Sequence, residues 1–217
     1  IEARVDTAED TFWNQMSAAV YSDGTGWGGK QINGLALLVS KTPTSGIVGG
    51  IDRSSQVWWR NVAVNANTDS RGVVTSSNIQ SYMNSTSIQL KRNSDGVDLI
   101  VADNNYYLAY LNSLQAIQRI TDDKLGAAGF SALKFYGGAG SADVVLGGGI
   151  GGNLAAGTMY FINTNYVHFR PHKDRNFVAI GGDRQAVNQD AVVRLIGWSG
   201  AITCSGAQFQ SVLTVTV

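Results

Sequence analysis

Apolar residues recur at three- and four-residue steps over the first part of the chain. The stripe consists of Ile1, Val5, Ala8, Phe12, Met16 and Ala19. This spacing predicts an amphipathic helix, which should end at Ser22–Gly24 because glycine readily closes a helix. The stripe is already running at Ile1, so we expect the natural upstream context of this helix to be missing from the sequence. A local capping pair formed by Asp6 and Glu9 is the alternative.

A helix, a strand and a second helix are predicted between residues 77 and 118. The segment Ser77–Leu90 has one apolar face, formed by Ile79, Met83, Thr86 and Leu90. The continuous apolar run Leu99–Ala102 is typical of a buried strand. Asp103 is expected to cap the following helix. The inner side of that helix would carry Tyr107, Leu111, Leu114 and either Ile117 or Gln118.

The chain beyond Gly126 has the pattern of β-structure. Short strands are expected at Leu133–Tyr136, Asp143–Leu146, Thr158–Ile162, Tyr166–Phe169 and Phe177–Ile180. A longer strand is expected from Gln189 to Trp198, and the alternating segment Phe209–Val217 predicts a last one. The sequence therefore predicts an α+β chain with a sheet-rich C-terminal half. It shows no internal repeat and no linker that would separate autonomous domains.

Composition excludes several classes of protein. The 217 residues are 44% hydrophobic, which argues against disorder. The 16 basic residues balance the 16 acidic ones, which argues against tight electrostatic capture of nucleic acid or of an acidic membrane. Cys204 is the single cysteine, so a framework of intrachain disulfides is excluded. No apolar run approaches the roughly 20 residues that a membrane helix needs.

Two glycine-rich segments approach nucleotide-binding motifs. Gly24–Lys30 has the spacing of a phosphate-binding loop, but Gln31 stands where a Ser or Thr should bind magnesium. The segment also follows a helix instead of a strand. Gly147–Gly152 has the spacing of a dinucleotide fingerprint, but Ala155–Gly157 leads directly into another predicted strand. Both segments are therefore interpreted as tight turns.

No other pattern predicts chemistry. His168 and His172 could share a metal on a helix, but Pro171 disfavours a helix there and no third ligand is evident beyond Asp174. We interpret the two histidines as part of a hydrogen-bonded corner or an intersubunit contact. Gly129–Leu133 lacks the last glycine of a nucleophile elbow. The residues thus predict no enzyme, no metal and no cofactor.

A series of short motifs, taken together in order, resembles the major capsid proteins of tailed bacteriophages. They are Gly34–Leu35, Val48–Arg53, Trp58–Asn61, Asp98–Ala102, Gly157–Thr164, Phe169–Phe177, Val187–Ala191 and Gly197–Gly200. The resemblance spans nearly the whole chain, which makes it far more specific than any single motif.

The resemblance implies the Johnson, or Hong Kong-type, capsid fold, which herpesvirus floors and encapsulin shells share. Residues 1–34 would form the spine helix and glycine turn of a peripheral domain, and residues 35–156 a mixed α/β axial domain. Residues 157–200 would form the long peripheral strands, and residues 201–217 would return to the axial domain. The N-terminal arm and extended loop of the family have no counterpart here, so we expect a truncated, processed or partly sequenced chain.

The function implied by the resemblance is assembly. Such a protein forms hexamers and pentamers of an icosahedral shell around double-stranded DNA, held without sequence-specific binding. Scaffold, portal and decoration proteins would be its partners, with no membrane involved. Its location would be the virion, after assembly in the host bacterial cytoplasm. The candidate intersubunit contacts are Trp58, Trp59, Arg60, Arg170, His172, Asp174, Arg175 and Trp198. Core packing is the alternative for each of them, and it is weighted most for Trp58 and Trp198.

Two alternative functions stay open from the sequence. An encapsulin-like compartment would share the fold and enclose enzymes instead of a genome. A nucleotide-binding enzyme would instead use Gly24–Lys30 or Gly147–Gly152.

Overall fold

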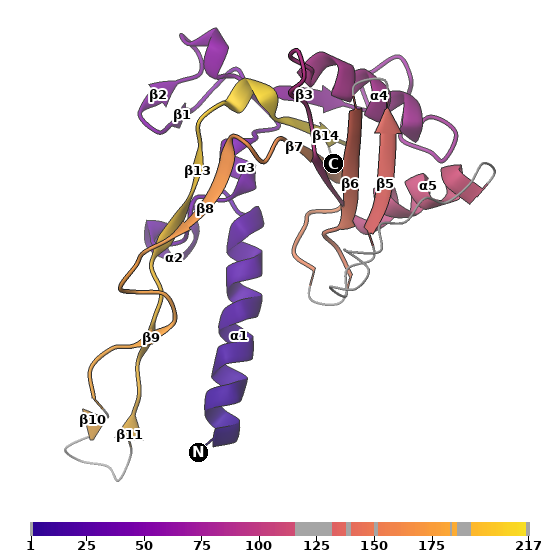
Figure 1. Cartoon of the computed structure of the whole chain (residues 1–217). Coiled ribbons are helices and arrows are strands. Elements are labelled where there is room, and N and C mark those ends of the chain that lie inside the picture. Colours follow the sequence, from indigo (N-terminus) through magenta and orange to yellow (C-terminus); the bar gives the residue numbers. More distant parts are fainter. Residues whose placement is uncertain are drawn as a thin grey trace.

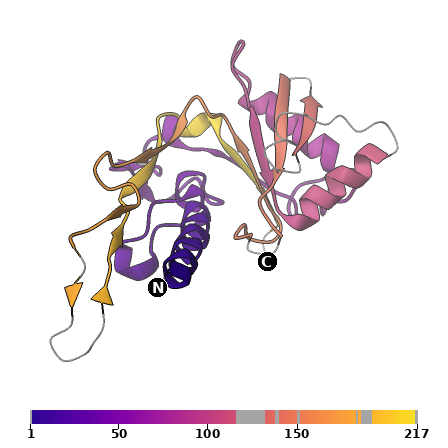
Figure 2. The same ribbon diagram turned by 60° about the horizontal axis from the view of Figure 1, so that its bottom comes forward.

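The computed structural model describes residues 2–115, 132–137, 140–149, 152–182, 184–185 and 192–215 (Figure 1). A long helix, α1 (Glu2–Tyr21), lies between a β-ribbon on one side and a six-stranded sheet on the other (Figures 1 and 2). The predicted first helix is confirmed. It ends before Gly24, whose φ of 81° is the left-handed conformation that glycine adopts without strain.

The six-stranded sheet is mixed, and its order is β3-β14-β7-β4-β6-β5. The strands are β3 (Val62–Asn65), β14 (Ser211–Thr214), β7 (Thr158–Ile162), β4 (Leu99–Ala102), β6 (Gly140–Leu146) and β5 (Ala132–Gly137). Two neighbouring pairs, β14 with β3 and β4 with β6, are parallel, and the others are antiparallel. Every residue of β7 and of β14 is buried, so both faces of the sheet centre are covered.

Helices α4 (Ile79–Leu90) and α5 (Asn104–Gln115) pack together and form the larger core with the sheet strands. The predicted apolar face of α4 is buried, including Ile79 and Met83. Asp103 caps α5 as expected, since its Oδ1 accepts a hydrogen bond from the N–H of Tyr106 at 3.0 Å. The α+β class and this helix–strand–helix unit are therefore confirmed; Ile117 and Gln118 lie outside the described residues.

A second core joins α1 to the sheet. Helix α3 (Leu35–Leu38) packs with residues of β4, β7 and β14. Val20 and Tyr21, from the last turn of α1, pack against the same cluster. The C-terminal end of α1 is thus anchored on the sheet by apolar burial.

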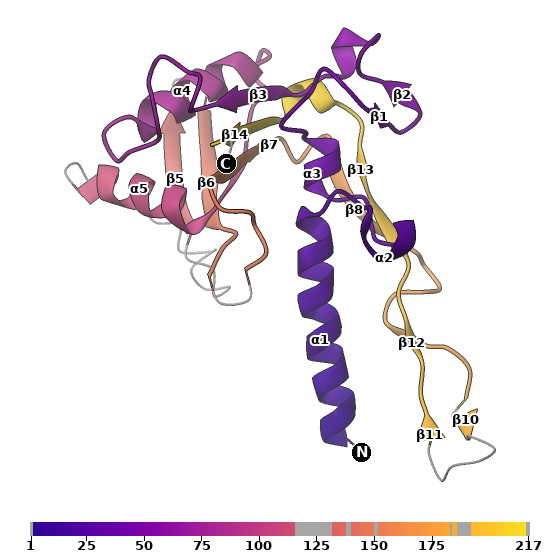
Figure 3. The same cartoon turned by 180° about the vertical axis from the view of Figure 1, so that it is seen from behind.

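The ribbon runs beside α1 to the level of the N-terminal end of that helix (Figures 1 and 3). It begins with the antiparallel pair β8 (Val167–Pro171) and β13 (Gly200–Cys204). It continues with β9 (Val178–Ala179) on β12 (Ile196–Gly197), and with β10 (Arg184–Gln185) on β11 (Val192–Val193).

Short elements complete the described chain. Glycine-rich α2 (Gly26–Gly29) follows α1, and 3₁₀ helix η2 (Ala207–Phe209) precedes β14. Strands β1 (Ile47–Val48) and β2 (Ile51–Asp52) form a small hairpin that leads to 3₁₀ helix η1 (Val57–Trp59). We call the hairpin and η1 together the hairpin end of the molecule.

Three strand assignments differ from the expectation. Thr158–Ile162 lies inside the six-stranded sheet instead of with the long strands, because an apolar run suits a strand that is buried on both faces. The described part of Gln189–Trp198 is two short strands, with Arg194 and Leu195 between them. Of the C-terminal segment, β14 joins the sheet but β13 belongs to the ribbon.

The turn Asn163–Tyr166 connects β7 of the sheet to β8 of the ribbon. Asp95 Oδ1 accepts hydrogen bonds from Nδ2 of Asn163 at 2.8 Å and from Nδ2 of Asn165 at 3.1 Å. Its Oδ2 accepts one from the Tyr166 hydroxyl at 2.7 Å. Hydrogen bonds from Asn163 and Tyr166 stabilise the charged carboxylate and so lower the pKa of Asp95.

Two further side chains hold the same turn. Asp98 accepts hydrogen bonds from both the N–H and the hydroxyl of Thr164, the first at 2.8 Å. Gln210 Oε1 accepts the N–H of Asn163 at 2.8 Å. We call Asp95, Asp98 and the turn Asn163–Tyr166 the carboxylate latch. It fixes the direction in which the ribbon leaves the sheet.

The Asp95→Asn substitution should lower the melting temperature, because the neutral amide loses charge-assisted hydrogen bonds. The lowered pKa means that the contribution of Asp95 is fully present above about pH 4, the range of an unfolded Asp, and is lost as pH falls through the lowered pKa of the folded chain. Calorimetry should therefore show a gap between wild type and variant that closes from pH 6 toward pH 3. Asp10→Asn, on exposed α1, is the control; a gap independent of pH would contradict the latch.

Candidate assembly surfaces

The structure places the eight predicted contact residues at two separate locations. The hairpin end carries Trp58, Trp59 and Arg60, and the ribbon or its flanking turns carry Arg170, His172, Asp174, Arg175 and Trp198. Their chemical surroundings divide them into residues that hold the chain together and residues that face outward.

The two adjacent tryptophans of η1 have opposite environments. Trp59 is 8% exposed, and its indole N–H donates a hydrogen bond to the carbonyl of Val48 at 3.1 Å. Trp58 is 55% exposed and meets Trp59 edge to face, with ring centroids 5.6 Å apart. Trp59 therefore holds the hairpin onto η1, whereas Trp58 presents its ring to solvent together with the exposed side chains of Ile47 and Val57.

Arg60 is bound within its own chain. Its Nε donates to the carbonyl of Arg53 at 2.6 Å, and Nη2 donates to the carbonyl of Ser54 at 2.7 Å. Arg53 itself is buried and donates to the carbonyl of Leu38 at 2.5 Å. Burial lowers the pKa of the Arg53 guanidinium. The two arginines thus fix the loop that precedes η1, and sequence alone did not distinguish this role from an interface.

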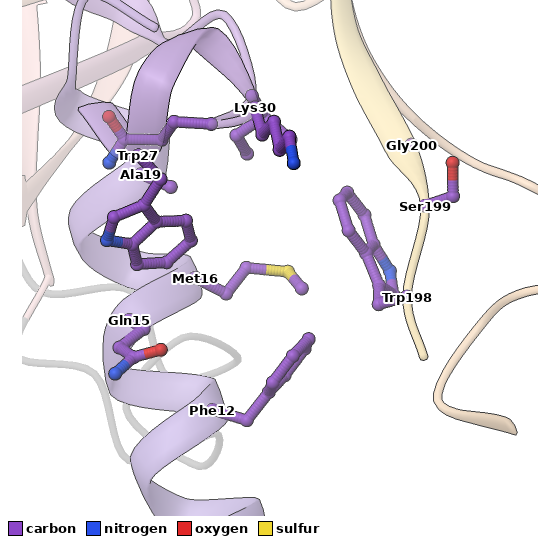
Figure 4. Close-up of a pocket in the computed structure, with 11 residues that line it drawn as sticks. Phe12, Gln15, Met16, Ala19, Trp27, Lys30, Trp198, Ser199 and Gly200 are labelled. Carbon is purple, nitrogen blue, oxygen red and sulfur yellow. The ribbon is translucent and has the colours of Figure 1, made fainter. Parts of the chain in front are cut away.

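Trp198 packs between the ribbon and α1. Its ring stacks on Phe169 with centroids 5.5 Å apart. It also lines a pocket of about 240 Å³ opposite Phe12 and Met16 (Figure 4). Among the described atoms its indole N–H has no hydrogen-bond partner. This position agrees with the packing alternative for Trp198.

Phe177 fastens the ribbon to α1. Its ring stacks on Trp13 at 4.3 Å and meets Phe12 edge to face at 5.1 Å. Its φ of 54° is rare for a residue with a bulky side chain, so the aromatic contacts hold a strained backbone in place. The sequence pattern placed Phe177 in a strand and did not single out Trp13, because only tertiary packing brings the two together.

His172 forms a hydrogen-bonded corner, which is one of the two interpretations from the sequence. The backbone N–H of His172 donates a hydrogen bond to the carbonyl of Ser199 at 2.8 Å. Its ring Nδ1 accepts a hydrogen bond from the backbone N–H of Asp174 at 3.2 Å. The side chains of Arg170, Asp174 and Arg175 are exposed around this corner. Within the described ranges, no three His, Cys, Asp or Glu side chains are grouped so that they could hold a metal ion.

The glycine-rich segments have the geometry of turns. Gly24–Lys30 contains the short turn α2, with positive φ at Gly24, Trp27, Gly28 and Gly29, and no helix begins at Lys30 as a phosphate-binding loop requires. After β6 the described chain reaches β7 without a helix.

Burial raises the pKa of the Cys204 thiol, which disfavours the thiolate that a nucleophile needs. None of the helices that the structure describes is long and apolar enough to cross a membrane.

The two tryptophans of η1 provide a matched pair of substitutions. Trp59→Ala should lower the free energy of unfolding by about 3 kcal/mol, because it empties a packed site and removes a buried hydrogen bond. Trp58→Ala should change it by less than about 1 kcal/mol, because the ring is exposed. Urea denaturation measures both; equal losses would contradict the assignment of the two rings.

Phe177→Ala should release the ribbon from α1. The aromatic contacts disappear while the positive φ remains, so limited proteolysis should cut the ribbon several-fold faster. Phe177→Gly relieves the backbone strain and should still show the faster cleavage, because the ring contacts are missing. Val178→Ala, an exposed neighbour, serves as the control. Unchanged cleavage in both Phe177 variants would show that the ribbon is held elsewhere.

Comparison with known proteins identifies the architecture. No protein-family model matches the chain, and no curated protein sequence does. Among solved structures, the chain is similar to a cyanophage A-1(L) capsid asymmetric unit, with a TM-score of 0.64 and 16% sequence identity. The match covers 99% of this chain and 68% of that chain. The chain therefore has the fold of a phage capsid subunit, as the resemblance in its sequence predicted.

Proposed function

We propose that the protein is a major capsid subunit of a tailed phage, which self-assembles into hexamers and pentamers of an icosahedral shell around double-stranded DNA. The observation that carries the proposal is the similarity of almost the entire chain to a subunit of a phage capsid. That fold supports a structural role, in which the protein would act by assembly instead of catalysis. Its location would be the virion, after assembly in the host bacterial cytoplasm.

The arrangement of ribbon and sheet supports a division into a peripheral and an axial unit, with boundaries that differ from those expected from the sequence. In this proposal α1 with the ribbon forms the peripheral unit, and the six-stranded sheet with α4 and α5 forms the axial unit. Strands β7 and β14 then belong to the axial unit and β13 to the peripheral unit. The carboxylate latch would set the angle between them.

The surface supports repeated weak contacts. Trp58, Trp13 and Trp27 are all more than half exposed. Exposed aromatic side chains are typical of interaction surfaces, where they contribute most of the binding energy. Closed symmetry would multiply such contacts into a stable shell. The formal net charge of zero suits a wall that encloses DNA without binding its sequence. Scaffold, portal and decoration proteins would be further partners.

Negative-stain electron microscopy of the protein expressed from its complete gene tests the proposal. We expect closed shells of uniform size, because identical subunits with closed symmetry form particles of defined diameter. Particles filled by the phage should protect double-stranded DNA from nuclease. Shells that hold a protein cargo instead would indicate an encapsulin-like compartment. Monomers under all assembly conditions would contradict the proposal.

A further inference from the structure

Helix α1 carries an acidic face. Its sequence contains the acidic residues Glu2, Asp6, Glu9 and Asp10 and one basic residue, Arg4. The helical repeat of about 100° per residue places Asp6, Glu9 and Asp10 within one arc of the surface, with Trp13 in the same arc. The three carboxylates are exposed, and the ring of Trp13 is 55% exposed. We call these four residues the acidic face.

An apolar groove continues from the acidic face toward the sheet. Trp13 belongs to both, and Met16 and Val20 line the groove one and two turns further along α1. The opposite wall comes from β4, β7, β8 and β13, and includes Val101, Ile162, Phe169 and Ile202. The groove has a volume of about 500 Å³ and is open to solvent. Such an apolar surface next to carboxylates fits a segment that carries both apolar and basic side chains.

The ribbon carries that combination. Its described part exposes five basic side chains, namely Arg194 and the four cations Arg170, Lys173, Arg175 and Arg184. Apolar side chains are exposed between and beyond them, at Val178, Val193 and Leu195. Of the acidic side chains on the ribbon, the structure describes Asp174.

Within the described part of the chain, the three carboxylates of the acidic face and the four cations of the ribbon have no ion-pair partner. The ribbon and α1 lie side by side (Figures 1 and 3). At Phe177 the contact between them is formed by aromatic rings and not by charged side chains. The described carboxylates and cations are therefore open to a partner of opposite charge.

We propose that the acidic face and groove of one copy receive the basic ribbon of a second copy. The contact joins different surfaces, so it is head-to-tail and can close into a ring. This inference rests on the proposed function and names the surfaces that would carry it. A second copy fits better than a nucleic acid, because phosphates would leave Val178, Val193 and Leu195 uncovered. The chain has 16 acidic and 16 basic residues, so a second copy can supply the opposite charges for each surface.

Charge reversal on each surface tests the pairing. One variant carries Glu9→Lys and Asp10→Lys, and the other carries Lys173→Glu and Arg175→Glu. Each alone should weaken self-association at least about tenfold in sedimentation velocity at about 50 mM salt, because like charges would meet. An equimolar mixture of the two should associate again, since each then offers the surface that the other lacks. Raising the salt to about 0.5 M should weaken the wild type and the mixture alike.

Lys41→Glu, an exposed reversal outside both surfaces, is the control and should associate like the wild type. Shells or oligomers from each reversal variant alone would overturn the pairing and leave the proposed function standing. A wild-type chain that stays monomeric would contradict the proposed function and the pairing together. Loss of DNA binding in the Lys173→Glu, Arg175→Glu variant with unchanged self-association would assign the ribbon to nucleic acid and overturn the pairing.

Discussion

The turn between β7 and β8 determines how the two parts of the molecule are joined. Strand β7 is buried at the centre of the sheet, whereas β8, which begins the ribbon, is largely exposed. Asp95 and Asp98, both from the loop before β4, fix the intervening turn. Helix α1 connects the sheet to the ribbon a second time, because Val20 and Tyr21 anchor the helix on the sheet and Phe177 anchors the ribbon on the helix. Surfaces far apart in the sequence thereby keep a fixed geometry, which identical contacts in a closed assembly require.

The elements that the sequence predicted well are those that local patterns specify. Helix α4 follows from its 3.6-residue period, β4 from its apolar run, and α5 from the cap at Asp103. The position of β7 in its sheet was not predictable, because an apolar run indicates burial without naming the neighbouring strands. The opposite environments of Trp58 and Trp59 depend on how η1 packs against the hairpin, which composition cannot show. The aromatic contact at Phe177 joins residues more than 160 positions apart and has no local signal.

The distribution of charge and apolar surface is consistent with a protein that works in many copies. The net charge is zero, yet carboxylates gather on α1 and cations on the ribbon. Exposed apolar side chains occur at the hairpin end, along the groove and on the ribbon, and include Trp58, Trp13 and Val178. In the proposed closed ring of copies, these apolar side chains would be buried and the charges would be paired.

A cryo-electron microscopy reconstruction of particles assembled from the complete gene tests the central claim most directly. The account predicts an icosahedral shell into which this fold can be placed with its latch intact. In that shell Trp58 and the groove beside Trp13 should be covered by neighbouring subunits. A shell in which both surfaces remain open to solvent, or particles without icosahedral symmetry, would contradict the account.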